Sequence, residues 1–287
     1  MDSDFRLCMK FWGVRGSTPT PQIENLSYGG NTPCLEVRLP NNEVFIFDGG
    51  TGIRTLGASL LQGSEDQKVS LKVFLTHFHW DHIQGIPFFP PLYYEENEVT
   101  FHSVGFLEGT HRRMGSNSGL EETLKIQMRN PYFPIGFDFL PAKKDFVEID
   151  LEALKFGKLT MHPFPLHHPG KAFGYRIESE GAVIVYASDL EHGHQELDTV
   201  VRDFSQNADL LIFDSQYTPE DYEKQKGWGH STWLEACRVA NEAKVKQLAL
   251  FHHDPSYDDQ KFFQIVQEAR RKFENTVGAQ EGHSVVL

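Results

Sequence analysis

The segment Thr76–His82 constrains this chain more than any other, because it crowds three imidazoles and a carboxylate into a few positions after an apolar run. Its sequence is THFHWDH, and the residues VFL precede it. In an extended segment residues i and i+2 point the same way, so His77 and His79 can face one metal ion. Asp81 and His82 follow where the chain turns toward a helix. The segment therefore offers two adjacent pairs of metal ligands.

Coincidence is a poor explanation of this spacing. A random chain with 14 His among 287 residues would contain the pattern H-x-H-x-D-H roughly 0.002 times. Imidazole nitrogen and carboxylate oxygen suit Zn²⁺, while Mn²⁺ or Fe²⁺ would fit where carboxylates and water complete the shell. The segment therefore predicts a metal site.

Four ligands cannot complete two metal sites, and the sequence supplies further candidates just past other apolar runs. The segment PLHHPG offers His167 and His168, VYASDLE offers Asp189, and LALFHHDP offers His252 and His253. An aspartate after an apolar strand is usually a turn or cap residue. Because Asp189 accompanies the first cluster, we interpret it as a ligand.

Short β-type runs alternate with helix signals, a pattern that predicts an α/β fold. One helix is predicted over 52–63, and Thr232 with Glu235 forms a capping box at the start of another. A third helix near the C-terminus carries an apolar stripe. The predicted strands lie in CLEVRL, EVFIFD, SLKVFL, FGYRIES, AVIVYA, DLLIFD and QLALF.

A single domain over 1–287 is expected, because no repeat or low-complexity linker divides the chain. Between about 87 and 150 the pattern becomes rich in aromatic residues and proline. We interpret this segment as an insertion that packs over a site, rather than as a continuation of the sheet. The alternative is a satellite core cluster without functional meaning.

Charge and cysteine content narrow the range of partners and compartments. The formal net charge of −13 should repel phosphate backbones, so nucleic acid is a less expected partner than a small molecule. Three widely spaced cysteines fit a reducing compartment. The acidic start MDSDFRLCMK and the shortness of the apolar runs argue against a signal peptide or membrane helix. We expect a cytoplasmic protein.

Eight segments together resemble the metallo-β-lactamase superfamily, in the family's order and over nearly the whole chain. The segments FGYRI and GHST resemble its phosphodiesterase branch, which includes ribonuclease Z and class II cyclic-nucleotide phosphodiesterase-like proteins. The resemblance implies a four-layer αββα sandwich and possible homodimers. The eight segments are GVRGSTPTP, YGGNTPC, FDGGTG, THFHWDH, HHPGKAFGYRI, VYASDLE, GWGHST and LFHHDP.

The resemblance also implies a complete set of ligands for two divalent metal ions. Asp48 in FDGGTG would orient a ligating imidazole, although it could equally be a structural cap. His253 remains an alternative to the last ligand. The implied first site is His77, His79 and His168, the second is Asp81, His82 and His252, and Asp189 would bridge them.

By resemblance, catalysis would use Asp81, His230 and Glu191. Two metal ions would acidify a shared water for attack on a phosphodiester. His230 in GWGHST would protonate the leaving group, supported by a hydrogen bond that it donates to the Glu191 carboxylate. The alternative for His230 is a structural residue before the Thr232 cap.

The expected function is that of a dinuclear metal-dependent phosphodiesterase that hydrolyses cyclic or small nucleotides. One alternative is an endoribonuclease of the ribonuclease Z type, although no basic, Gly/Pro-rich arm for an RNA body is recognisable. The other alternative is a metal-binding sensory or interaction module with little catalysis.

Overall fold

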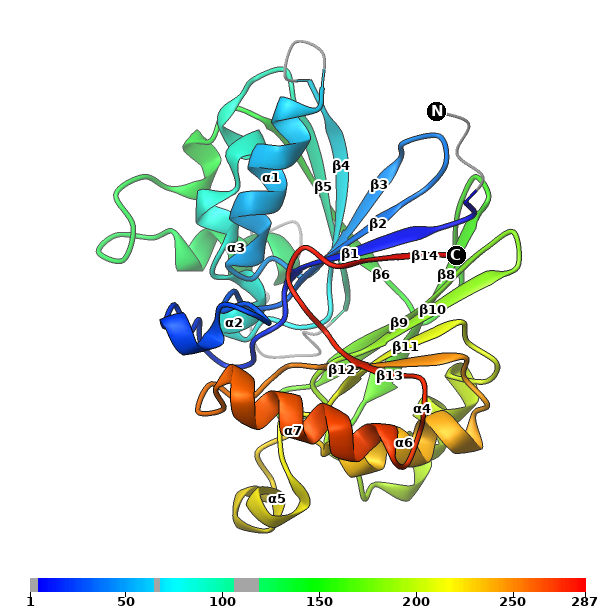
Figure 1. Ribbon diagram of the computed structural model, residues 1–287. Coiled ribbons are helices and arrows are strands. Elements are labelled where there is room, and N and C mark those ends of the chain that lie inside the picture. The colour runs from blue at the N-terminus through cyan, green and yellow to red at the C-terminus, as the bar shows by residue number, and fades with distance from the viewer. Residues whose placement is uncertain (1–4, 65–67, 106–118) are drawn as a thin grey trace.

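The computed structural model describes residues 5–64, 68–105 and 119–287. Over these ranges the chain forms two seven-stranded sheets that pack face to face, with helices on the outer faces (Figure 1). The arrangement confirms the predicted αββα sandwich. Within the described ranges, no helix combines the length and apolar character needed to cross a membrane.

The first sheet contains strands from the N-terminal half of the chain and the last strand. Its order is β14 (Ser284–Val286), β1 (Cys8–Gly13), β2 (Cys34–Arg38), β3 (Val44–Phe47), β4 (Ser70–Leu75), β5 (Glu98–Val104) and β6 (Lys143–Ile149). Pairing is antiparallel from β14 to β3 and parallel from β3 to β6.

The second sheet contains the remaining strands. Its order is β13 (Thr276–Gly278), β12 (Gln247–Phe251), β11 (Leu210–Asp214), β10 (Ala182–Ala187), β9 (Ala172–Ser179), β8 (Leu159–Leu166) and β7 (Leu154–Phe156). Strands β10 to β13 are parallel, and β7 to β10 pair antiparallel. Strands β8, β10, β11 and β12 consequently run in the same direction.

Helices cover the outer face of each sheet (Figure 1). The first sheet carries α1 (Gly52–Gln62) and α3 (Gly119–Gln127), and the second carries α4 (Gln195–Phe204), α6 (Trp233–Glu242) and α7 (Asp259–Arg270). The connections contain α2 (Trp80–Ile83), α5 (Pro219–Gln225), η1 (Ile23–Asn25), η3 (Ile86–Phe88), η4 (Pro90–Tyr93) and η5 (Phe137–Phe139).

Apolar side chains fill the space between the sheets and the space under each helical layer. Between the sheets, the ring of Phe47 on β3 lies 5.4 Å from that of Tyr175 on β9 and 6.3 Å from that of Tyr186 on β10. Such buried aromatic pairs contribute about 1 kcal/mol each beyond their area burial. They also fix how the strand ends of the two sheets face each other.

Most elements predicted from the sequence are present where expected. Strands β11 and β12 are apolar and almost wholly buried, as parallel strands covered on both faces should be. Helix α6 begins at Thr232, whose hydroxyl accepts a hydrogen bond from the Glu235 backbone N–H at 3.1 Å. The predicted N-cap at Thr232 is therefore confirmed, whereas the Glu235 carboxylate accepts a hydrogen bond from Arg238 at 2.9 Å instead of completing the predicted capping box.

The interpretation of 87–150 as an insertion outside the sheet is wrong for its strands. Strands β5 and β6 extend the first sheet in parallel register. Phe89, Leu92, Leu124 and Phe137 from the same segment are buried against the outer face of this sheet. The aromatic and proline residues obscured two ordinary strands and their covering layer. Residues 106–118 of this segment lie outside the described residues.

Polar residues follow six strands at their carboxyl ends, and these ends meet at one edge of the sandwich. Strands β3 and β4 are parallel in the first sheet, and β8, β10, β11 and β12 share one direction in the second. Carboxyl ends of such strands are where α/β sheets place their functional residues. The residues at or just after the six ends include Asp48, His77, His168, Asp189, Asp214 and His252.

The buried His102 on β5 should make folding stability depend on pH. Its ring stacks on Phe74 at 4.3 Å, and burial lowers its pKa to about 4. In the unfolded chain the pKa of His102 is near 6.5, so between pH ~4 and ~6.5 the unfolded state binds more protons than the folded state. The contribution of neutral His102 to folding stability is therefore fully present above pH ~6.5 and is lost as the pH falls toward ~4. Replacing His102 by Phe should make the urea midpoint fall less between pH 7.5 and 4.5.

The solvent-exposed His283 offers a matched control for this measurement. His283→Gln should leave the pH dependence of the urea midpoint close to that of the unsubstituted chain. An equal change in both variants would show that burial of His102 is not the cause.

Candidate metal centre

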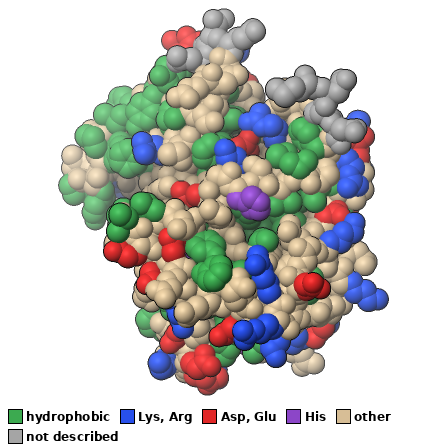
Figure 2. Space-filling view, viewed as in Figure 1, with side chains coloured by type: hydrophobic (Ala, Val, Ile, Leu, Met, Phe, Trp, Pro, Cys, Tyr) green, Lys and Arg blue, Asp and Glu red, His purple; other side chains and the backbone are tan. Residues whose placement is uncertain are grey.

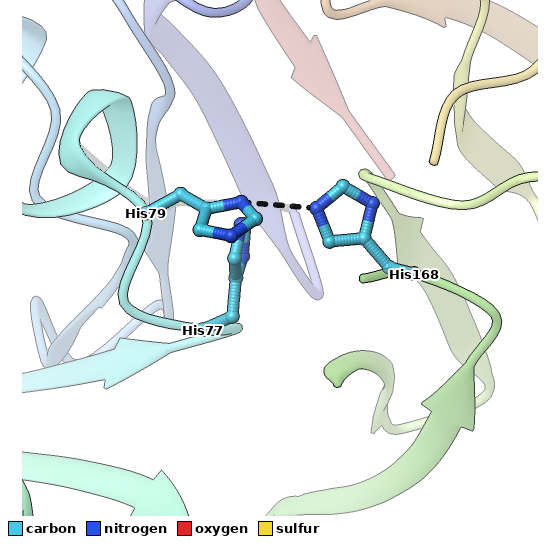
Figure 3. A group of neighbouring side chains, drawn as sticks. All are labelled: His77, His79 and His168. Atoms are coloured by element: carbon cyan, nitrogen blue, oxygen red, sulfur yellow. Dashed lines mark hydrogen bonds between the residues drawn. The ribbon is translucent and has the colours of Figure 1, made fainter. Parts of the chain in front are cut away.

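The structure brings all seven predicted ligands together at the edge where the strand ends meet. His77 and His79 come from the loop after β4 in the first sheet, and His168 comes from the loop after β8 in the second sheet (Figure 3). Six of the seven side chains are buried, whereas His79 is exposed and opens the cluster to solvent. The cluster divides into one group of His77, His79 and His168 and a second group of Asp81, His82, Asp189 and His252.

The first group consists of three imidazoles whose rings converge (Figure 3). The Nδ1 atom of His79 lies 3.0 Å from Nε2 of His168. The ring of His77 lies 4.5 Å from that of His79 and 5.0 Å from that of His168. Nε2 of His77 is buried and has no hydrogen-bond partner. An orphaned buried nitrogen is costly, so it marks a position where a ligand atom is needed.

The second group has the spacing of a four-coordinate site. Nε2 of His82 lies 3.0 Å from Oδ2 of Asp189, 3.5 Å from Oδ2 of Asp81 and 3.4 Å from Nε2 of His252. Nε2 of His252 lies 3.1 Å from Oδ2 of Asp81 and 3.3 Å from Oδ2 of Asp189. Ligands bound tetrahedrally at about 2.0 Å lie about 3.3 Å apart. The donor set therefore fits a zinc-type ion.

Asp189 lies between the two groups and offers one oxygen to each. Its Oδ2 belongs to the second group, while Oδ1 is 3.7 Å from Nε2 of His77 and 3.8 Å from Nε2 of His168. This placement agrees with the bridging position expected from the sequence. The two clusters could hold two divalent ions that share this carboxylate.

Three residues of the centre adopt a left-handed backbone conformation that non-glycine residues rarely adopt. The φ angles are 62° for Asp48, 60° for Asp189 and 61° for His252. Each of the three follows a buried strand, and the turn swings its side chain toward the cluster. Such strain costs of the order of 1–3 kcal/mol per residue and is concentrated at functional sites.

Hydrogen bonds from outside the cluster hold three imidazoles with Nε2 directed inward. Nδ1 of His82 donates to Oδ2 of Asp48 at 2.9 Å, and Nδ1 of His168 donates to the Gly229 carbonyl at 2.7 Å. Nδ1 of His252 donates to Oε1 of Gln216 at 2.8 Å. When Nδ1 carries the proton, Nε2 keeps its lone pair for a metal ion.

Asp48 also connects the two sheets. Besides His82, it accepts hydrogen bonds from the backbone N–H of Thr76 at 2.9 Å and from the Tyr186 hydroxyl at 2.8 Å. A role as a simple structural cap would account only for the bond from the Thr76 backbone N–H. Its position agrees with the orienting role expected from the sequence.

The two alternative histidines face away from the cluster. Nε2 of His253 donates to the Ala279 carbonyl at 2.8 Å, and its ring packs on Phe262. Nδ1 of His167 donates to the backbone carbonyl of Glu191 at 3.0 Å. The cluster therefore contains His168, which strand alternation favoured over His167, and His252, which the family resemblance favoured over His253.

His230 lies beside the cluster, but the predicted hydrogen bond to Glu191 is wrong. Nδ1 of His230 donates to Oδ2 of Asp214 at 2.8 Å. Glu191 instead accepts hydrogen bonds from the backbone N–H groups of Gly227 at 2.7 Å and Gly229 at 2.8 Å. The acid partner is thus Asp214, and Glu191 holds the loop that carries His230. Asp214 ends a buried strand just before a polar residue, and that signal, shared with Asp189, could have identified it.

The centre shifts the pKa of several side chains in directions that suit its chemistry. Burial lowers the pKa of His168 to about 4 and holds that of His77 well below its usual value, so both are neutral at pH 7. Burial opposes protonation of His230 too, but the carboxylate of Asp214 outweighs it and raises the pKa to about 9. His230 is therefore a proton donor at neutral pH.

A loop after β1 completes the wall of the site, although none of its residues was predicted to form part of the site. The backbone N–H of Ser17 donates to Oδ2 of Asp81 at 2.8 Å. At Gly16, an added Cβ would lie 2.5 Å from Nδ1 of His252, so only glycine lets the backbone approach. The segment GVRGSTP thus contributes backbone rather than side chains to the centre.

Comparisons with known proteins agree with this geometry. Residues 44–253 match the family model described as Beta-lactamase superfamily domain. Ribonuclease Z of Pyrococcus furiosus is 26% identical over 88% of both chains. Among solved structures, the metallo-β-lactamase fold protein YhfI from Bacillus subtilis superposes with a TM-score of 0.72 at 18% identity, covering 99% of this chain and 100% of that one. The short form of human tRNase Z gives 0.64 at 17% identity, covering 97% and 98%.

The matched residues include every predicted ligand and His230, and the superposed chains share the four-layer architecture over almost their whole length. Three of the most similar curated relatives share the name ribonuclease Z. The chain is a hydrolase that belongs to the metallo-β-lactamase superfamily.

Proposed function

We propose that this protein is a metal-dependent phosphodiesterase that cleaves RNA, in the manner of ribonuclease Z. The observation that carries the proposal is the pairing of a two-metal ligand cluster with a protonated His230 beside it. Hydrolysis of a phosphodiester needs both a nucleophile and a donor for the departing alkoxide, which a site for better leaving groups would not need.

The ligand groups and Asp189 would hold two divalent ions, most consistent with Zn²⁺. When bound, such ions acidify a water molecule and neutralise negative charge on the phosphodiester. Asp81 and Asp189 add two carboxylates to this set, and His77 and His168, whose pKa values are lowered by burial, reach it in neutral form. Asp48, Gln216 and the Gly229 carbonyl would keep the imidazoles in the tautomer that binds metal.

His230 would donate its proton to the leaving oxygen. The carboxylate of Asp214 keeps the imidazole charged and sets its orientation through the 2.8 Å hydrogen bond. Glu191 fixes the loop around His230 through two backbone N–H groups. His230 would thus donate the proton, Asp214 would stabilise its charge, and Glu191 would position its loop.

The substrate expectation made from the net charge, the aromatic-rich segment and the lack of a recognisable RNA-binding arm, a small nucleotide in preference to nucleic acid, is not supported by the comparisons. Relatives covered over most of their length are named ribonuclease Z. The net charge of −13 is unfavourable for binding of RNA phosphates, and two bound divalent ions would offset it with positive charge at the site. Cyclic nucleotides remain the second candidate, favoured by that acidic balance.

The proposal predicts metal-dependent cleavage of single-stranded RNA. Protein loaded with Zn²⁺ should contain close to two ions per chain and should cleave a labelled oligoribonucleotide faster than it cleaves cyclic mononucleotides. The measurement is metal content by elemental analysis together with initial rates on both substrates. Cleavage of cyclic nucleotides alone would support the second candidate. A protein that binds ions but cleaves neither would contradict the proposal.

Removal of the acid should slow reactions with poor leaving groups. His230→Ala is expected to lower kcat on RNA by about 10²- to 10⁴-fold, and to lower it much less on bis-p-nitrophenyl phosphate, whose leaving group needs no proton. Because only protonated His230 can donate, the rate on RNA should fall as pH rises through its pKa. Asp214→Asn should move that fall to lower pH, which a pH–rate profile would detect. Equal losses on both substrates would exclude the acid role.

Removal of the orienting carboxylate should weaken metal binding without removing a ligand. Asp48→Asn is expected to lower Zn²⁺ affinity by about 10- to 100-fold, because His82 loses the acceptor that fixes its tautomer. Competition with a chromophoric chelator measures this change. Asp209→Asn is the matched control, since Asp209 is also buried and bonded but precedes β11 at the opposite end of the sheet. Equal affinity in the two variants would refute the orienting role.

A further inference from the structure

Two tryptophans flank the cluster, and both are exposed to solvent. Trp80 lies between His79 and Asp81 and is 77% exposed, and Trp228 lies between Gly227 and Gly229 and is 64% exposed. Tryptophan is largely buried in most proteins, so two exposed rings beside one site need an explanation. Exposure alone does not single them out, because Tyr132 and Phe139 are also exposed. The two tryptophans differ from these residues in being next to ligands of the cluster or to the loop of His230.

A short chain of contacts through the first ligand group links the backbone at Trp80 to the backbone beside Trp228. Trp80 follows His79, whose Nδ1 lies 3.0 Å from Nε2 of His168. Nδ1 of His168 in turn donates to the carbonyl of Gly229, the residue after Trp228. Only two imidazole rings therefore separate the backbone at Trp80 from the backbone beside Trp228.

Both tryptophans are carried on backbone that is held in place. Glu191 accepts hydrogen bonds from the N–H groups of Gly227 and Gly229, on either side of Trp228. Asp81, next to Trp80, accepts a hydrogen bond from the Ser17 N–H at 2.8 Å. An exposed ring on fixed backbone loses little conformational entropy when it binds a partner.

A cavity on the Trp228 side offers room for a nucleotide. It measures about 430 Å³ and is lined in part by His192, Tyr222 and Lys226. Its lining also contains Glu223 and Glu235, so its charges are mixed and give no strong attraction for phosphate. Over the face of the molecule drawn in Figure 2, hydrophobic side chains are likewise interspersed with charges of both signs. Affinity on this side must depend mainly on contacts other than ion pairs.

We infer that Trp80 and Trp228 are stacking platforms for the nucleobases on the two sides of the scissile phosphate. This inference rests on the proposed function and narrows its substrate to a single strand with at least two bases. Aromatic rings stack on any base and discriminate little between sequences. A cyclic mononucleotide would engage only one of the two platforms.

The test compares zinc-loaded variants on three substrates. These are an adenosine decanucleotide, an abasic chain of the same length, and methyl p-nitrophenyl phosphate, which has no nucleobase. Trp80→Ala and Trp228→Ala should each raise KM for the decanucleotide by about 5- to 100-fold. The kcat/KM for the small ester should change by less than about twofold. Trp→Phe variants should recover part of the loss.

Two controls separate stacking from other effects. Phe263 is an exposed aromatic residue on the outer helix α7, and Phe263→Ala should leave all three substrates unaffected. The loss caused by the tryptophan variants should persist between 50 and 200 mM salt, because stacking releases few counterions, whereas a lost phosphate contact would change the salt slope.

Each outcome has a distinct meaning. Equal losses on the decanucleotide, the abasic chain and the small ester would show that the tryptophans shape the site and would overturn the inference. A loss no larger than that of Phe263→Ala would overturn it too. Zinc-dependent turnover of the small ester by the unsubstituted protein is read separately, since its absence would refute the proposed phosphodiesterase activity itself.

Discussion

The structure depends on one unfavourable arrangement, the burial of six imidazole and carboxylate side chains where the ends of two sheets meet. Taking such groups out of water costs several kcal/mol unless they find partners. Hydrogen bonds satisfy their outer atoms, but Nε2 of His77 has no hydrogen-bond partner. Folding of the two sheets therefore produces a set of atoms that protein groups alone do not satisfy, and a divalent cation is the partner that suits them.

Asp48 shows how the core and the centre depend on each other. It accepts hydrogen bonds from His82 and Thr76 of the first sheet and from Tyr186 of the second. Tyr186 also packs against Phe47 in the core between the sheets. The packing that holds the sheets together thereby sets the orientation of a ligand. Glu191, which is also buried, acts in a comparable way by holding the loop around His230.

Sequence reasoning located the ligands through two local properties, strand alternation and position at strand ends, together with the resemblance to the superfamily, which implied the complete set. His77 and His79 obey the two-residue period, and the same period separates His168 from His167. The partner of His230 was not predictable in this way, because its choice between Asp214 and Glu191 depends on how two loops pack. Strands β5 and β6 were missed since aromatic and proline residues around them belong to the covering layer, which sequence spacing does not distinguish from an insertion.

The unequal exposure of the two ligand groups has a kinetic consequence. His79 faces solvent, whereas Asp81, His82, Asp189 and His252 are all enclosed. An ion in the first group would exchange with the surrounding solution directly, while one in the second would have to pass the first or wait for the walls to open. Metal loading should then be ordered, and partial depletion would yield a population with one retained ion rather than a mixture of empty and full chains.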